Sequence, residues 1–159
     1  MGDADQWRWS EAHAEVLLIA DTAARGAVAG VGCDIQSVCD VQSALRTYGS
    51  RYVNRLLDPS ERGVRDAQPM ELTQRFAVKE AVAKALGVPS DAPLPWPSIV
   101  VHPHMCGHNV RQRQWTVRVV GYAGRYAERH GIQEWKAWSW RENQILGTFG
   151  CAIAIALNV

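Results

Sequence analysis

The sequence predicts a single α+β domain. Its 159 residues, 47% of them hydrophobic and 21% charged, suit one globular unit with a sizeable core. Helix-like and strand-like segments alternate along the chain in the order α, β, α, α, β, β, α, β, β, with no internal repeat. This order indicates an α+β domain, which we expect to be an antiparallel sheet packed on a long helix.

The first predicted elements are a helix and a strand. Ser10 precedes a helix-favouring stretch that ends near Gly26. The segment GAVAGVGCDIQSV then predicts a short buried strand that starts near Ala29, because small and β-branched residues alternate in it. The alternating residues are Val31, Cys33 and Ile35.

Helical segments follow this strand. A helix is expected from about Val38 to Leu57, with an interruption at Gly49. Asp58 and Pro59 suit the cap and the first turn of another helix. The clearest helix runs from Glu71 to Leu86, since Ala, Leu, Glu, Lys and Gln favour that state and Gly87 follows as a stop.

The second half of the chain predicts two hairpin pairs around a short helix. A proline-rich connector at 89–97 leads into strands 98–104 and 114–121, then a helix at 121–131, then an antiparallel pair at 135–140 and 150–157.

Charge and cysteine usage exclude several classes of protein. A formal net charge of +1 gives no global field for nucleic acid. The four cysteines form no CxxC pair, which fits reduced thiols in the cytoplasm. The apolar run VLLIA at 16–20 is far shorter than the roughly 20 residues that a membrane span needs. We expect a cytoplasmic protein that binds neither nucleic acid nor membrane.

The segment RFAVKEAVAKALG at 75–87 places Lys79, Glu80 and Lys84 within otherwise apolar surroundings. Glu80 and Lys84 lie four residues apart and share a helix face, with Lys79 about 100° away. Taken alone, this spacing is typical of an exposed ion pair worth about 0.3 to 0.5 kcal/mol. A second acid changes the interpretation.

Asp34 lies among small apolar residues in GVGCDI. A carboxylate in such a setting is costly unless it is paired or binds a metal. Magnesium accepts one or two carboxylates, waters and phosphate oxygens. Asp34 and Glu80 with a lysine one turn away would therefore form an oxygen-rich magnesium site beside a cation.

The sequence resembles the holo-acyl-carrier-protein synthases, which are small 4'-phosphopantetheinyl transferases. GVGCDI at 30–35 is similar to the GxxxDI opening of that family, and LLDPSER at 56–62 is similar to its F-T-x-x-E-R segment. RFAVKEAVAKALG matches the pattern F-A-x-K-E-A-x-x-K-A-x-G at every defined position. The resemblance implies a transferase-like domain at 29–159 and leaves residues 1–28 as an N-terminal helical extension.

The resemblance also implies a site and a reaction. Asp34 and Glu80 would bind Mg2+, while Lys84, with Lys79 nearby, would contact the pyrophosphate of coenzyme A. A carrier-protein serine would attack the phosphorus next to pantetheine and expel adenosine 3',5'-bisphosphate. Either Glu80 or a metal-bound water would take the serine proton. A homotrimer is also implied.

The chain departs from the family pattern at the carrier-docking helix. An arginine is common six residues after the metal-binding aspartate, but Asp40 stands there. Three arginines further along either replace the missing arginine or are scattered surface residues; they are Arg46, Arg51 and Arg55.

A second departure lies near the C-terminus, where WKAWSWR replaces a W-H-V-S-L-S-H pattern. Arg141 would bind phosphate in place of the histidine. Trp138 and Trp140 would either fill the nucleotide groove or pack against a neighbouring subunit. The first option favours an alternative function, a non-catalytic binding or scaffolding domain within a larger synthase.

The segment HPHMCGHN offers a third possibility. His102, His104, Cys106 and His108 alternate as zinc ligands could. Pro103 and Gly107 favour a turn instead, so we expect a hairpin tip here. The main expectation is a magnesium-dependent transfer of 4'-phosphopantetheine from coenzyme A to an acyl, polyketide or peptide carrier protein.

Overall fold

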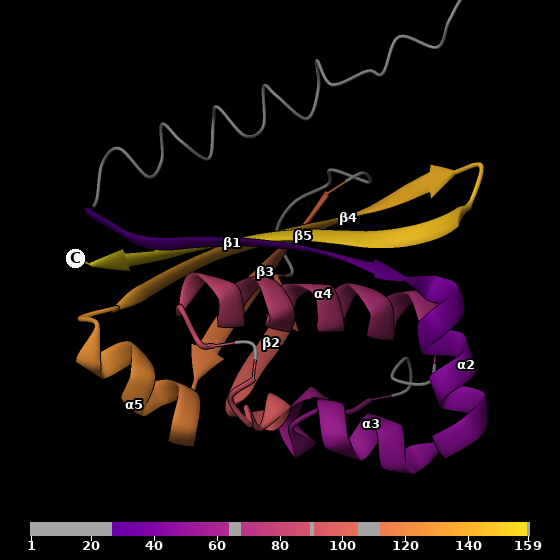
Figure 1. Cartoon of the computed structure of the whole chain (residues 1–159), viewed down its shortest axis with the longest axis horizontal. Coiled ribbons are helices and arrows are strands. Elements are labelled where there is room, and N and C mark those ends of the chain that lie inside the picture. Colours follow the sequence, from indigo (N-terminus) through magenta and orange to yellow (C-terminus); the bar gives the residue numbers. More distant parts are fainter. Residues whose placement is uncertain (1–26, 64–67, 90, 105–111, 159) are drawn as a thin grey trace, which may run out of the picture.

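A five-stranded antiparallel sheet forms the framework of the domain (Figure 1). The computed structural model describes residues 27–63, 68–89, 91–104 and 112–158. The strands lie in the order β1-β5-β4-β3-β2, so β1 and β2 form the edges. Their bounds are β1 Ala27–Ser37, β2 Ile99–Pro103, β3 Gln112–Val119, β4 Glu134–Gln144 and β5 Gly147–Asn158. The α+β prediction is confirmed.

The described helices all lie on one face of this sheet (Figure 1). The 17-residue helix α4 crosses the middle of that face, and most of its residues are buried. The helices are α2 Val38–Tyr48, α3 Ser50–Leu56, α4 Pro69–Ala85 and α5 Gly121–Arg129, with 3-10 turns η1 Pro59–Glu61 and η2 Trp96–Ser98. We call this side of the sheet the helix face and the other side the outer face.

Strand β1 was predicted correctly, but its predicted burial was wrong. Val31 and Ile35 are 57% and 68% exposed. Successive strand residues point to opposite sides, so these two lie on the outer face, which no described helix covers, while Gly32 and Asp34 lie on the helix face.

The other sequence-based elements are confirmed, with shifted ends. Gly49 adopts a φ of 54° and divides the expected long helix into α2 and α3. Asp58 caps the 3-10 turn η1, accepting a hydrogen bond from the Ser60 amide at 2.9 Å. The two hairpins are β2–β3 and β4–β5. The helix predicted at residues 10–26 lies outside the described residues.

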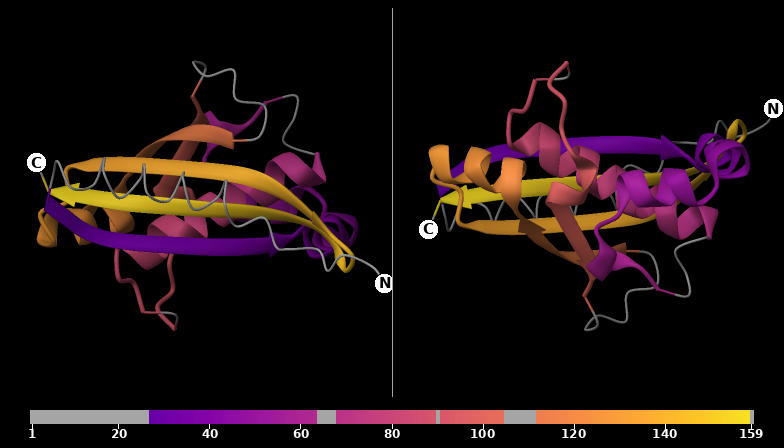
Figure 2. Two further views of the ribbon diagram at one scale, coloured as in Figure 1. Left: turned by 90° about the horizontal axis from the view of Figure 1, so that it is seen from above. Right: turned by 90° about the horizontal axis from the view of Figure 1, so that it is seen from below.

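Helix α4 lies against a path of small residues in the sheet, and Figure 2 shows it beside β1 and β5 from two sides. A Cβ at Gly30 or Gly32 would collide with the carbonyl oxygen of Ala85 or Ala81, respectively. The path continues on β5 with buried alanines, which are Ala152, Ala154 and Ala156. Small side chains therefore set the distance between α4 and the sheet.

We predict that Gly32→Ala destabilises the fold. The added methyl group would overlap the backbone of α4, and overpacking of this kind costs about 1–3 kcal/mol. Chemical denaturation measures the loss. Gly63→Ala is the matched control, because a Cβ at Gly63 meets nothing within 4 Å. Equal stability of the two variants would contradict the close approach of α4.

Candidate active site

Asp34 is held between two hydrogen-bond donors on the helix face. Its side chain is 10% exposed, and Oδ1 accepts a hydrogen bond from Lys84 Nζ at 2.7 Å. Gln36 Nε2 donates to Oδ2 at 2.8 Å. Lys84 also donates to the Cys33 carbonyl oxygen at 2.9 Å. The glycines of β1 permit these contacts, because they let α4 approach the strand.

Glu80 lies one helical turn before Lys84 and is half-buried. Burial raises the pKa of Glu80 above its usual range, the negative charge of Asp34 raises it further, and Lys84 opposes both effects. The hydrogen bond to Asp34 raises the pKa of Lys84. The structure therefore brings together three of the residues that the sequence selected: Asp34, Glu80 and Lys84.

This group fits a hard divalent cation. Burial and, to a smaller extent, the charge of Asp34 raise the pKa of Glu80, and a nearby cation would favour the charged form of both carboxylates. In the described part of the chain, no cluster of three or more His, Cys, Asp and Glu side chains forms a metal site. Magnesium does not require such a cluster, since it keeps several waters and takes phosphate oxygens as ligands.

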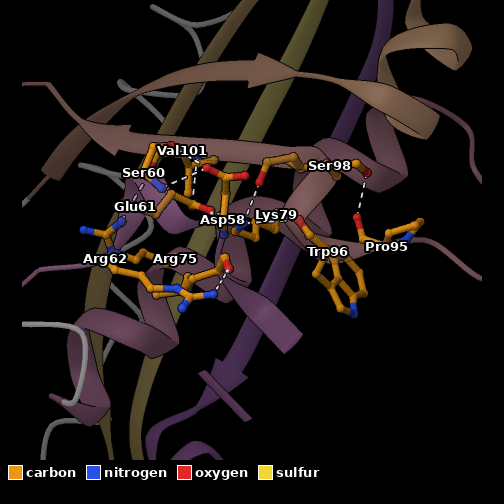
Figure 3. Close-up of polar contacts among 12 residues, drawn as sticks. Asp58, Ser60, Glu61, Arg62, Arg75, Lys79, Pro95, Trp96, Ser98 and Val101 are labelled. Atoms are coloured by element: carbon orange, nitrogen blue, oxygen red, sulfur yellow. Dashed lines mark hydrogen bonds and ion pairs between the residues drawn. The ribbon is translucent and has the colours of Figure 1, made fainter. Parts of the chain in front are cut away.

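Lys79 occupies a different environment, the protein core (Figure 3). Its side chain is fully buried, and Nζ donates to Glu61 Oε2 at 2.7 Å and to the carbonyl oxygens of Trp96 and Ile99 at 3.2 and 2.5 Å. Burial lowers the pKa of Lys79, and Glu61 opposes that effect. Its ammonium has an acceptor for each of its three protons.

Glu61 completes this buried network. Its Oε2 also accepts from the Asp58 amide at 2.7 Å, and Oε1 accepts from the Val101 amide at 3.1 Å. The pair therefore ties the turn η1 and the strand β2 to helix α4. Lys79 lies on another side of α4 from the Asp34–Glu80–Lys84 group, as expected for its 100° offset from Glu80.

Trp138 and Trp140, the tryptophans that depart from the family pattern, lie on the outer face. Trp138 packs against Ile155, Leu157 and Ile153 in a small apolar cluster. Trp140 follows two residues later on β4 and points to the same side. Neither side chain lies between the sheet and α4, where Asp34 is.

Arg141 lies on the helix face in the hairpin that β4 and β5 form. It is opposite Gly150, and Gly150 is opposite Gln36, so these residues form one row across three strands. No β5 side chain separates Arg141 from Gln36, and neighbouring strands are about 4.8 Å apart. The Arg141 side chain is exposed, and its Nε donates to Asn143 Oδ1 at 3.1 Å.

The remaining candidate residues lie near the surface. Asp40 is exposed in the first turn of α2, and the three arginines are exposed on α2 and α3. Two of the residues in the zinc hypothesis, Cys106 and His108, lie outside the described residues.

Sequence reasoning missed two residues of these networks. Gln36 could have been found from strand periodicity, because it lies two positions after Asp34. Glu61 was part of the recognised LLDPSER segment, but no local pattern links it to Lys79, 18 residues away.

Comparisons with known proteins show the family of this chain. The family model described as "4'-phosphopantetheinyl transferase superfamily" matches residues 30–153. A holo-[acyl-carrier-protein] synthase of Frankia casuarinae is 39% identical over 110 residues, which cover 69% of this chain and 83% of that protein. The corresponding synthase of Solibacter usitatus is 31% identical over 109 residues, which cover 67% and 82%.

Solved structures of acyl-carrier-protein synthases have the same fold. The Plasmodium yoelii protein with ADP bound aligns with a TM-score of 0.65 and 19% identity, covering 83% of this chain and 96% of that one. The Helicobacter pylori protein in complex with coenzyme A aligns with a TM-score of 0.60 and 20% identity, covering 79% and 98%.

The fold and the matched sequence define a phosphopantetheinyl-transferring enzyme, and the chain belongs to the 4'-phosphopantetheinyl transferase superfamily. Within that superfamily it is of the holo-acyl-carrier-protein synthase type. In the described part of the chain, no helix is both long and apolar enough to cross a membrane.

We predict that Lys79→Met destabilises the protein strongly. Removing one partner of a buried ion pair leaves Glu61 charged and uncompensated, which costs about 3–5 kcal/mol. Arg125→Met is the matched control, because Arg125 is exposed on α5, away from the outer face. A surface substitution of this kind changes stability by about 0.5 kcal/mol or less. Urea unfolding of both variants gives the comparison, and similar losses would refute a special role for Lys79.

Proposed function

We propose that this protein transfers 4'-phosphopantetheine from coenzyme A to a serine of an acyl, polyketide or peptide carrier protein. The observation that carries the proposal is the group formed by Asp34, Glu80 and Lys84, which places two carboxylates beside a half-exposed ammonium. A site with that composition suits a cation and a phosphate together.

In this proposal Asp34 and Glu80 hold Mg2+. The metal would supply charge neutralisation on the pyrophosphate of coenzyme A. Lys84 is 52% exposed and is able to donate to a phosphate oxygen from the edge of α4. Arg141 faces the same side and provides a second cation, with a planar group suited to phosphate. Lys79 contributes through the core, by fixing the helix that carries Glu80.

The chemistry is a phosphoryl transfer in which the serine hydroxyl attacks the phosphorus next to pantetheine. The new serine O–P bond forms as the pyrophosphate bond breaks, and adenosine 3',5'-bisphosphate leaves. Lys84 and Arg141 stabilise the negative charge that develops on the leaving group. In this proposal Glu80, which is half-buried one helical turn before Lys84, would also accept the serine proton.

The carrier protein would dock beside α2, which begins directly after β1 and therefore next to Asp34. We propose that exposed arginines replace the missing positive charge at Asp40. These are Arg46 on α2 and Arg51 and Arg55 on α3.

We also propose a cytoplasmic location. Free thiols at Cys33, Cys39 and Cys151 support a reducing, cytoplasmic setting.

Self-association as a homotrimer is the second part of the proposal. The outer face supports it, because it carries the exposed Val31 and Ile35 on β1 and the half-buried Trp138 and Trp140 on β4, with β5 between them. Apolar side chains gathered on one face in this way are typical of an interaction site. In this proposal the tryptophans belong to an interface. They then do not fill the nucleotide groove, so they give no reason to prefer the non-catalytic alternative.

The transfer is tested by intact-mass spectrometry of apo carrier proteins incubated with the chain, Mg2+ and coenzyme A. We expect a gain of one phosphopantetheine mass that requires Mg2+. Glu80→Gln should abolish the gain, and Lys84→Ala should slow transfer by about 100-fold or more, because each removes transition-state stabilisation of a few kcal/mol. Asp91→Asn, at an exposed residue of the connector, is the matched control for Glu80→Gln.

Failure of every carrier to gain mass would reject the transferase proposal. Unchanged transfer by Glu80→Gln would instead reject the assigned site. Circular dichroism of Glu80→Gln should show a folded protein, because the charge removed is one that burial and Asp34 disfavour.

The homotrimer is tested by light scattering after size-exclusion chromatography. We expect wild-type protein at three times the chain mass and Val31→Lys at the chain mass, because a lysine on the outer face would be desolvated in an interface. Gln133→Lys, at an exposed residue before β4, should remain trimeric. Monomeric wild-type protein would exclude the assembly.

A further inference from the structure

Gln36 lies on the same face of β1 as Asp34 and contacts it directly. Its Nε2 donates to Asp34 Oδ2 at 2.8 Å, while Lys84 Nζ donates to Oδ1 at 2.7 Å. Each oxygen of the Asp34 carboxylate thus has one side-chain donor, and the two donors come from different elements, β1 and α4.

The two donors differ in charge and in setting. Lys84 is a half-exposed cation on a flexible side chain, and the proposed function uses its charge at a phosphate. Gln36 is neutral and half-buried on the strand. A neutral amide orients a carboxylate without neutralising its charge, so it does not compete with a metal cation for that charge.

The neighbouring strand β5 places no side chain opposite Gln36. The residue opposite it on β5 is Gly150, which has no side chain to pack against the glutamine. A Cβ at position 150 would lie 3.0 Å from Thr73 Cγ2 and 3.3 Å from the Gln74 amide nitrogen, so a larger residue is disfavoured there. In the described part of the chain, the Gln36 amide has Asp34 Oδ2 as its hydrogen-bond acceptor.

We propose that Gln36 is a positioning residue that holds Asp34 in the orientation required to bind the divalent cation. It acts through Asp34 and touches neither coenzyme A nor the reacting atoms. Removing a group that hydrogen-bonds to a metal ligand lowers metal affinity or activity by about 10–100-fold. The inference rests on the proposed function, because that function makes Asp34 a metal ligand.

The test is a titration of the full chain with Mn2+ alone, in the absence of coenzyme A, followed by electron paramagnetic resonance of the free ion. Gln36→Met keeps the length of the side chain but has no donor, and Gln36→Ala removes the side chain. Both should bind Mn2+ about 10–100-fold more weakly than wild type. Gln133→Met, at an exposed position, is the matched control and should bind as wild type does.

A second readout separates positioning from a purely structural role. In the transfer assay, the Mg2+ concentration for half-maximal rate should rise in Gln36→Met, while the rate at saturating Mg2+ stays within a few-fold of wild type. Thermal unfolding should be unchanged. A lower unfolding temperature with unchanged Mn2+ affinity would assign Gln36 to stability alone and overturn the proposal.

The outcomes distinguish this inference from the proposed function. Wild-type transfer with equal Mn2+ affinity in wild type and Gln36→Met overturns the role of Gln36 and leaves the transferase intact. Weaker Mn2+ binding by the variant, in a chain that modifies no carrier, supports the role of Gln36 and rejects the transferase. Transfer that needs no divalent cation, together with no Mn2+ binding by wild type, overturns both metal assignments.

Discussion

The close contact between helix α4 and the glycine-containing strand β1 is the constraint on which the site depends. Because Gly32 has no side chain, the backbone of α4 at Ala81 lies directly on the strand. Only at that separation does Lys84 reach both Asp34 and the Cys33 carbonyl oxygen. The packing of small residues in the core thus determines the geometry of charged residues at the edge of the helix.

Helix α4 carries two electrostatic groups of opposite kind. Lys79 and Glu61 form a buried pair of one positive and one negative charge, so that group is neutral and fully hydrogen-bonded. Asp34, Glu80 and Lys84 combine two negative charges with one positive charge, which leaves a net charge of −1 near the surface. The first group ties η1 and β2 to α4, and the second is the group to which the proposed function assigns the cation.

Much of this arrangement could be predicted from the sequence, because local patterns determine it. Helical spacing placed Glu80 and Lys84 on one face, and the cost of an isolated acid among apolar residues singled out Asp34. The partner of Lys79 depends on tertiary packing and left no local signal. The sequence left open whether Trp138 faces the nucleotide groove, because the pairing register of β4, β5 and β1, which sets its side relative to Asp34, is not encoded in any one strand.

Lys79 and Glu80 are neighbours in the chain, and this adjacency has an evolutionary consequence. A substitution at Glu61 would affect more than the core. It would leave Lys79 without its carboxylate partner, in the same turn of α4 that carries Glu80. Positions 61 and 79 should therefore change together among relatives or not at all. A residue far from the reacting atoms would then be preserved by selection on catalysis, although its own contacts are purely structural.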